Sequence, residues 1–233
     1  MAPLLRVFCV HGYRQDERSF RERTGSLRKL LKKRAELLYV SAPLRVPSLT
    51  GTGPGQQQQQ QQAPAAGTRA VETEGDGRGW WFSNPEEESF DALDKVESCK
   101  GLEESLETIG KAMTELGPFD GIMGFSQGAA LVSMICALGQ QGDPRFQFNF
   151  AILVAGFRSR CKLHDHFYKE SIILPTLHVF GETDRVIPGE LSRELSTTFV
   201  NPVVLTHTGG HFVPASAAQK QVYFEFLEKF EKK

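Results

Sequence analysis

The sequence Gly-Phe-Ser-Gln-Gly at residues 124–128 constrains the fold more than any other feature of the chain. It follows an apolar run, 120–124, that predicts a buried strand, and it precedes small and apolar residues, 129–138, that predict a helix. A G-x-S-x-G sequence in this context places the serine on a tight turn with its hydroxyl above a sheet. Larger side chains at 124 or 128 would collide with the neighbouring strand and helix. Ser126 is therefore the predicted nucleophile, and a purely structural turn is the alternative.

Strand-like and helix-like segments alternate along the rest of the chain. Short apolar runs predict strands at 4–10, 37–40, 120–124, 150–154, 177–180 and 203–206. Helical spacing of apolar residues predicts helices at 19–33, 90–96, 102–116, 129–138, 188–198 and 214–230. This alternation predicts an α/β fold with a mostly parallel central sheet and helices on both faces. Such sheets carry their functional groups in loops beyond the carboxyl ends of the strands.

Residues 47–79 differ from the rest of the chain in composition. They are rich in Gly, Pro, Ala, Thr and Gln and include seven consecutive glutamines at 56–62. A segment with so little to bury cannot offset the entropy of ordering it, which predicts a disordered surface insertion. Because the apolar rhythm resumes afterwards, we expect a single domain over residues 1–233. A tolerated loop expansion is favoured over an interaction tract.

Charge and cysteine content exclude several classes of protein. The 27 basic and 28 acidic residues give a net charge of −1, too small to draw the chain to nucleic acid or to an anionic membrane. No segment approaches the ~20 apolar residues of a transmembrane helix. None of the four cysteines, Cys9, Cys99, Cys136 and Cys161, belongs to a C-x-x-C pair, so neither a zinc knuckle nor a thioredoxin-like site is expected. Buried thiols in a reducing compartment are expected instead. The oligomeric state is left open.

A nucleophilic serine needs a base, and the base needs an acid that orients it. His211 follows the last predicted strand in a glycine-loosened loop, which suits proton transfer, and His207 is the alternative base. Asp184 follows the preceding strand and is the predicted acid, with Glu182 of the same loop as the alternative. Asp184 could also serve only as a cap for the next helix.

The remaining site residues are predicted from position and residue type. The N–H groups of Tyr13 and Gln127 are the predicted oxyanion hole, because they follow the first strand and the nucleophile; His11 is expected to be structural. Aromatic residues are predicted to line an acyl pocket that favours apolar chains, unless the tryptophans only fill the core: Trp80, Trp81, Phe82, Phe157 and Phe212.

Two further patterns are interpreted as chance or surface features. Ser26 and Lys29 fit S-x-x-K without any companion motif. His164 and His166 lack a third spaced ligand, so they indicate a solvated loop and not a metal site. No metal or cofactor is expected.

Five separated segments together resemble the family of serine hydrolases within the α/β-hydrolase fold; they are residues 11–15, 78–82, 117–130, 178–188 and 208–214. The resemblance spans nearly the whole chain apart from the Gln-rich insertion. It implies a cytoplasmic carboxylesterase with Ser126, Asp184 and His211 as nucleophile, acid and base. Fungal relatives in that family include thioesterases, and Gly-Phe-Ser-Gln-Gly is shared with acyl-protein thioesterases.

We therefore expect a serine carboxylesterase that hydrolyses acyl esters, with medium-to-long apolar acyl chains, through an acyl-serine intermediate. The substrate is expected to be a small-molecule or lipid-like acyl ester. A thioesterase that acts on acyl carriers or acylated proteins is the second hypothesis. A non-catalytic interaction module that recruits partners through the Gln-rich loop is the third.

Overall fold

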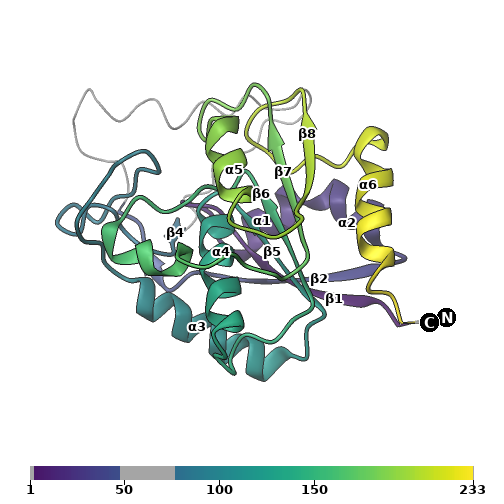
Figure 1. Cartoon of the computed structure of the whole chain (residues 1–233), viewed down its shortest axis with the longest axis horizontal. Coiled ribbons are helices and arrows are strands. Elements are labelled where there is room, and N and C mark those ends of the chain that lie inside the picture. Colours follow the sequence, from purple (N-terminus) through teal and green to yellow (C-terminus); the bar gives the residue numbers. More distant parts are fainter. Residues whose placement is uncertain (1–2, 48–76, 233) are drawn as a thin grey trace.

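A six-stranded parallel sheet forms the centre of the computed structural model, which describes residues 3–47 and 77–232 (Figure 1). Its strands are β1 (Leu5–Val10), β2 (Ala35–Val40), β5 (Gly121–Phe125), β6 (Phe150–Val154), β7 (Thr176–Gly181) and β8 (Val203–His207). They lie in the order β2-β1-β5-β6-β7-β8, and every pairing within this sheet is parallel. The predicted fold class is confirmed.

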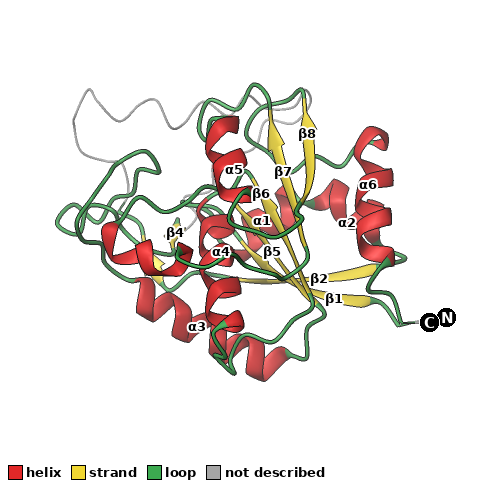
Figure 2. Cartoon of the chain, viewed as in Figure 1, coloured by secondary structure: helices red, strands yellow, loops and turns green. Residues whose placement is uncertain are grey.

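Helices cover both faces of the sheet (Figure 2). One face packs against α1 (Glu17–Arg23), α2 (Gly25–Leu31) and α6 (Ala217–Glu228), and the other against α3 (Leu102–Leu116), α4 (Gln127–Gln140) and α5 (Gly189–Ser196). Every residue of β5 and β6 is buried, as expected for central strands with helices on both sides. Helix α4, which carries no charged residue, is buried from Gln127 to Ala137.

The predicted helix at 19–33 is two helices that meet at Thr24. The Thr24 hydroxyl lies 2.8 Å from the backbone oxygen of Phe20, one turn earlier, and 2.6 Å from the hydroxyl of Tyr39 on β2. A threonine that bonds to the preceding turn bends a helix. The break therefore has a side-chain cause that the apolar spacing does not report.

The predicted helix at 90–96 is wrong, because these residues form no helix. The Ser83 hydroxyl accepts a hydrogen bond from Asp91 N–H, and the Asp91 carboxylate accepts one from Leu93 N–H. Val96 instead pairs with Cys161 in an isolated parallel bridge. Val96 N–H, which a helix would direct to Ala92 O, donates to Arg160 O, so the backbone pairs with a distant segment and not with its own turn.

The predicted insertion at 47–79 falls mostly on residues 48–76, which lie outside the described residues. At its end, β4 (Arg78–Gly79) pairs with β3 (Leu44–Arg45) in a two-stranded antiparallel sheet. Residues 78–79 therefore belong to ordered secondary structure, which corrects the predicted boundary. In the described ranges 3–47 and 77–232, no helix is both long and apolar enough to cross a membrane.

Four loops meet at one edge of the sheet because all the strands point the same way. The residue pairs Val10–Gly124 and Gly181–His207 bring the ends of β1 and β5, and of β7 and β8, level with one another. The loops that begin at these ends contain His11, Ser126, Asp184 and His211. This edge is where a parallel sheet places its functional groups.

Candidate active site

Ser126 occupies a strained turn between β5 and α4. Its φ of 54° and ψ of −119° lie in a region that residues other than glycine rarely adopt. A Cβ on Gly124 would overlap the backbone of Gly128, and a Cβ on Gly128 would overlap the backbone oxygens of Val10 and His11. The collision predicted for larger residues at 124 and 128 is therefore present, and it explains why glycine flanks the serine.

His211 lies between Ser126 and Asp184 and contacts both. Its Nε2 is 3.1 Å from Ser126 Oγ, and its Nδ1 is 2.7 Å from Asp184 Oδ2. A carboxylate only accepts hydrogen bonds, so Nδ1 carries the proton and Nε2 is free to accept from the serine hydroxyl. The His211 ring also packs on Phe125, the residue before the serine, at 4.7 Å between ring centroids. The three residues come from loops after β5, β7 and β8.

Asp184 has two separate sets of partners. Its Oδ1 accepts hydrogen bonds from Val186 N–H and Ile187 N–H, and its Oδ2 faces His211. The capping interpretation is wrong, because Val186 and Ile187 precede α5, whose N-cap Pro188 has no side-chain cap hydrogen bond. The acid interpretation is compatible with its position. The alternative acid, Glu182, is exposed, and its backbone N–H donates to the oxygen of His207.

His207, the alternative base, contacts residues of its own loop. Its Nδ1 accepts from Gly209 N–H at 3.2 Å, and its ring packs on Phe212. Burial lowers the pKa of His207, although the nearby Asp184 acts in the opposite direction. Within the described residues its buried Nε2 has no hydrogen-bond partner.

The loop after β1 is held by a buried histidine. His11 is fully buried; its Nδ1 lies 2.7 Å from Gly12 O, and its Nε2 accepts from Ala42 N–H at 2.9 Å. Burial lowers its pKa to about 4, so the ring is neutral near pH 7. These contacts agree with a structural role for His11. Tyr13 follows on this loop, at the same edge of the sheet as Ser126.

The Gln127 side chain makes contacts that sequence reasoning missed. Its Oε1 accepts from Trp80 N–H at 2.9 Å, and its Nε2 donates to Trp81 O at 2.8 Å. The Trp80 indole donates to His11 O, so these hydrogen bonds also connect α4 to the loop after β1. Gln127 is fully buried, and a buried amide needs hydrogen-bond partners. A glutamine next to the nucleophile, at the start of an apolar helix, is the sequence signal that could have predicted these contacts.

Gln127→Ala is expected to destabilise the protein by ~1–3 kcal/mol for each buried backbone group left without a partner. The measurement is urea-induced unfolding. Gln140, at the other end of α4, is a matched control, since it accepts from Ile173 N–H and donates to Ser171 O at an exposed position. Water can replace the lost amide there, so Gln140→Ala should cost less than about 0.5 kcal/mol. Equal losses in the two variants would contradict this account.

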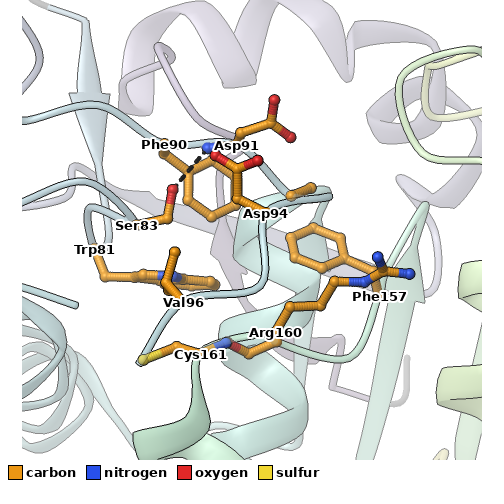
Figure 3. Close-up of a pocket in the computed structure, with 11 residues that line it drawn as sticks. Trp81, Ser83, Phe90, Asp91, Asp94, Val96, Phe157, Arg160 and Cys161 are labelled. Carbon is orange, nitrogen blue, oxygen red and sulfur yellow. Dashed lines mark hydrogen bonds between the residues drawn. The ribbon is translucent and has the colours of Figure 1, made fainter. Parts of the chain in front are cut away.

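The five residues predicted to line an acyl pocket do not all meet. Trp81 and Phe157 line one small cavity, with Phe90 between them (Figure 3). Trp80 is buried against His11, and Phe82 packs with Leu44 and Val46. Phe212 is 49% exposed and packs on His207. Trp81 and Phe157 thus share this cavity, and the other three predicted residues do not line it.

This cavity is nearly filled by its own side chains. Its volume is about 10 Å³, close to the minimum that holds one water molecule. The half-buried Phe90 ring lies 5.2 Å from Trp81 and 6.0 Å from Phe157, measured between centroids. A chain of several methylenes would enter only if Phe90 moved aside.

The expectation that His164 and His166 lie in a solvated loop is wrong for His164. Both belong to the 3₁₀ helix η2 (Lys162–Tyr168), where His164 is buried and His166 is exposed. His164 contacts Cys99 and Ser159, and the His166 ring packs on Phe167. The two histidines thus have different surroundings.

Comparisons with known proteins agree over nearly the whole chain. The family model described as "Serine hydrolase (FSH1)" matches residues 1–223. The protein named Esterase OVCA2 of Xenopus tropicalis is 57% identical over 227 residues, which cover 97% of this chain and 94% of the relative. The protein of the same name from Homo sapiens is 49% identical over 232 residues, which cover 97% and 96%.

Two solved structures share the fold at low sequence identity. SOBER1 of Arabidopsis thaliana has a TM-score of 0.62 at 15% identity, covering 97% of this chain and 99% of that one. Acyl-protein thioesterase 2 of Zea mays has a TM-score of 0.59 at 18% identity, covering 97% and 95%. At such identities the likeness concerns the arrangement of the sheet and helices.

Proposed function

The chain belongs to the FSH1 serine hydrolase family, and on that premise we propose that it is a carboxylesterase with Ser126 as nucleophile, His211 as base and Asp184 as acid. The observation that carries this proposal is the unbroken hydrogen-bond path from Ser126 Oγ through His211 to Asp184 Oδ2. Family membership also sets aside a non-catalytic interaction module, because the family and the similar proteins are hydrolases by name.

The proposed reaction uses this path twice. Ser126 Oγ attacks the ester carbonyl carbon while His211 Nε2 takes the hydroxyl proton, and Asp184 stabilises the resulting imidazolium. The N–H groups of Tyr13 and Gln127 hold the negatively charged carbonyl oxygen. His211 then protonates the leaving alcohol, which leaves an acyl group on Ser126. A water molecule, deprotonated by His211, attacks that group and releases the acid.

We propose that the acyl chain lies along Trp81, Phe90 and Phe157. Two contacts tie these aromatic residues to the nucleophile: Gln127 bonds to Trp81 O, and Ser126 N–H donates to Val154 O, at the end of β6 and shortly before Phe157. Each buried methylene contributes ~0.8 kcal/mol, or up to about 4-fold in kcat/KM. An apolar acyl ester, small or lipid-like, is therefore the proposed substrate.

Phe90→Ala is expected to raise the preference for long acyl chains, because it removes the ring between Trp81 and Phe157. We compare kcat/KM for an ester with about ten acyl carbons with kcat/KM for an ester with about two. The ratio of these two values should be about 4-fold or more higher in Phe90→Ala than in the wild type. The measurement is hydrolysis of a series of chromogenic esters. Ile173→Ala, which changes an exposed side chain outside this cavity, should leave the ratio unchanged. A wild-type kcat/KM that does not change with the length of the acyl chain would overturn the acyl-pocket proposal.

A thioesterase is the second candidate. The Gly-Phe-Ser-Gln-Gly sequence at 124–128 favours it, since acyl-protein thioesterases share this sequence. Matched oxygen and sulfur esters with the same acyl chain separate the two functions. A kcat/KM that is at least about tenfold higher for the sulfur ester would favour the thioesterase.

We propose the cytoplasm as the place of action. All four cysteines are free thiols, which suits a reducing compartment. Localisation of a tagged full-length chain tests this proposal.

A further inference from the structure

A second cluster of reactive side chains lies apart from the serine and consists of Cys99, Cys161 and His164. The two Sγ atoms and a ring nitrogen of His164 all lie within 4.8 Å of one another, and Cys99 Sγ is 3.0 Å from His164 Nε2. Cys161 and His164 are buried, and Cys99 is half-buried. The proposed ester hydrolysis uses none of these three groups.

The fold holds this cluster together with backbone hydrogen bonds. Val96 N–H donates to Arg160 O, and Lys162 N–H donates to Val96 O, so the segment before α3 lies against the segment that enters η2. Cys161 is the N-cap of η2, and its backbone oxygen accepts from His164 N–H at 2.9 Å. A cysteine and a histidine three residues apart are thereby placed on one turn, opposite Cys99.

The His164 ring is oriented as a metal ligand would be. Its Nδ1 is 2.7 Å from the Ser159 hydroxyl, which leaves Nε2 directed at Cys99. A histidine that binds a metal commonly uses its other ring nitrogen for such a hydrogen bond, which fixes the ring.

The spacing of the three atoms is close to that of a tetrahedral zinc site. With Zn–S near 2.3 Å and Zn–N near 2.0 Å, tetrahedral ligand atoms lie roughly 3.5–3.8 Å apart. The atoms of this cluster span 3.0–4.8 Å, so adjustments of about 1 Å would suffice. Thiolate and imidazole together favour zinc over magnesium or calcium.

We propose that Cys99, Cys161 and His164 bind one zinc ion, with water as the fourth ligand. Each thiol loses its proton to solvent as its sulfur binds the metal, so two protons are released for each ion bound. Cys99 and His164 also line a cavity of about 200 Å³, which has room for the water. The ion would tie the segment before α3 to η2.

The position of this site connects it to the aromatic cavity. Cys161 lines that cavity with Trp81, Phe90 and Phe157 (Figure 3). The Trp81 ring also packs edge-on against His164. A zinc ion at this place would therefore fix the Cys161 side of the proposed acyl pocket.

Cobalt binding and zinc content test the proposal without any measurement of esterase activity. The purified full-length protein, treated with chelator and titrated with Co²⁺, is expected to show thiolate-to-cobalt charge-transfer and tetrahedral ligand-field absorption that saturate at one ion per chain. Zn²⁺ should displace Co²⁺ and raise Tm. Cys99→Ser and His164→Gln should each lose the charge-transfer band or weaken Co²⁺ binding by at least tenfold. Cys136→Ala removes a buried cysteine from α4, outside the cluster, and should leave the spectrum unchanged.

Several outcomes would overturn the zinc site. One is a folded wild-type protein that gives no thiolate–cobalt band, and another is a band that persists undiminished in Cys99→Ser. Thiol counting that finds Cys99 and Cys161 joined in a disulfide in the purified protein would also do so. Circular dichroism of each variant shows whether the chain is folded. Failure here would leave the proposed esterase intact, since none of the three zinc ligands belongs to the path from Ser126 through His211 to Asp184.

Discussion

Ser126→Ala is expected to lower kcat for ester hydrolysis by about 10⁶-fold and to abolish covalent labelling by a fluorophosphonate probe. The hydroxyl is the group that forms the acyl intermediate, and it is the group that His211 Nε2 contacts. Alanine keeps the Cβ in the same strained turn, so Tm should hardly change. Gel-based probe labelling and hydrolysis of a chromogenic ester measure the two effects.

Ser133→Ala is the matched control for this prediction. Ser133 is a buried serine on α4 whose hydroxyl donates to Ala130 O. Its loss should leave both labelling and hydrolysis within about twofold of the wild type. Labelling that survives in Ser126→Ala would show that another residue carries the acyl group. It would overturn the proposed function.

The sequence predicted the structure best at positions where few structural settings can account for the residue type found there. Glycine on both sides of Ser126 has a steric reason, which the close approach of Gly128 to the end of β1 bears out. The apolar runs of β5 and β6 are buried on both faces, so they could be recognised without knowing their neighbours. Parallel strands then place Asp184 and His211 at the same edge as Ser126, which follows from strand direction alone.

The failures share one physical cause: contacts between segments that are distant in the sequence. Nothing in the spacing of residues 90–96 reveals that Val96 N–H donates to Arg160 O. The aromatic residues at 80–82 are adjacent in sequence, yet Trp80, Trp81 and Phe82 pack against three different neighbours. The contact between Cys99 and His164 was missed because the two residues lie 65 positions apart in the sequence. Such pairings need the tertiary fold.

Asp184→Asn is expected to lower kcat by about 10⁴-fold with little loss of stability. Asparagine keeps an Oδ1 that can accept from Val186 N–H and Ile187 N–H, so the loop after β7 keeps its hydrogen bonds. At the other position an NH₂ group would face His211 Nδ1. The ring would then carry its proton on Nε2, where it could no longer accept the proton of Ser126. Steady-state kinetics and thermal unfolding of the same preparation measure both effects.

Two further variants separate the roles that Asp184 combines. Asp184→Ala removes both sets of hydrogen bonds, so it should lower Tm as well as kcat, whereas Asp184→Asn should lower kcat alone. Glu182→Gln, in the same loop, neutralises an exposed carboxylate and should leave kcat within about twofold of the wild type. A large loss of kcat in Glu182→Gln, together with near-normal activity in Asp184→Asn, would show that Glu182 and not Asp184 is the acid. Oδ2 of Asp184 contacts His211, whereas Oδ1 holds the loop. If Asp184 had a purely structural role, Asp184→Asn would therefore keep near-normal kcat and Tm, and Asp184→Ala would lower both.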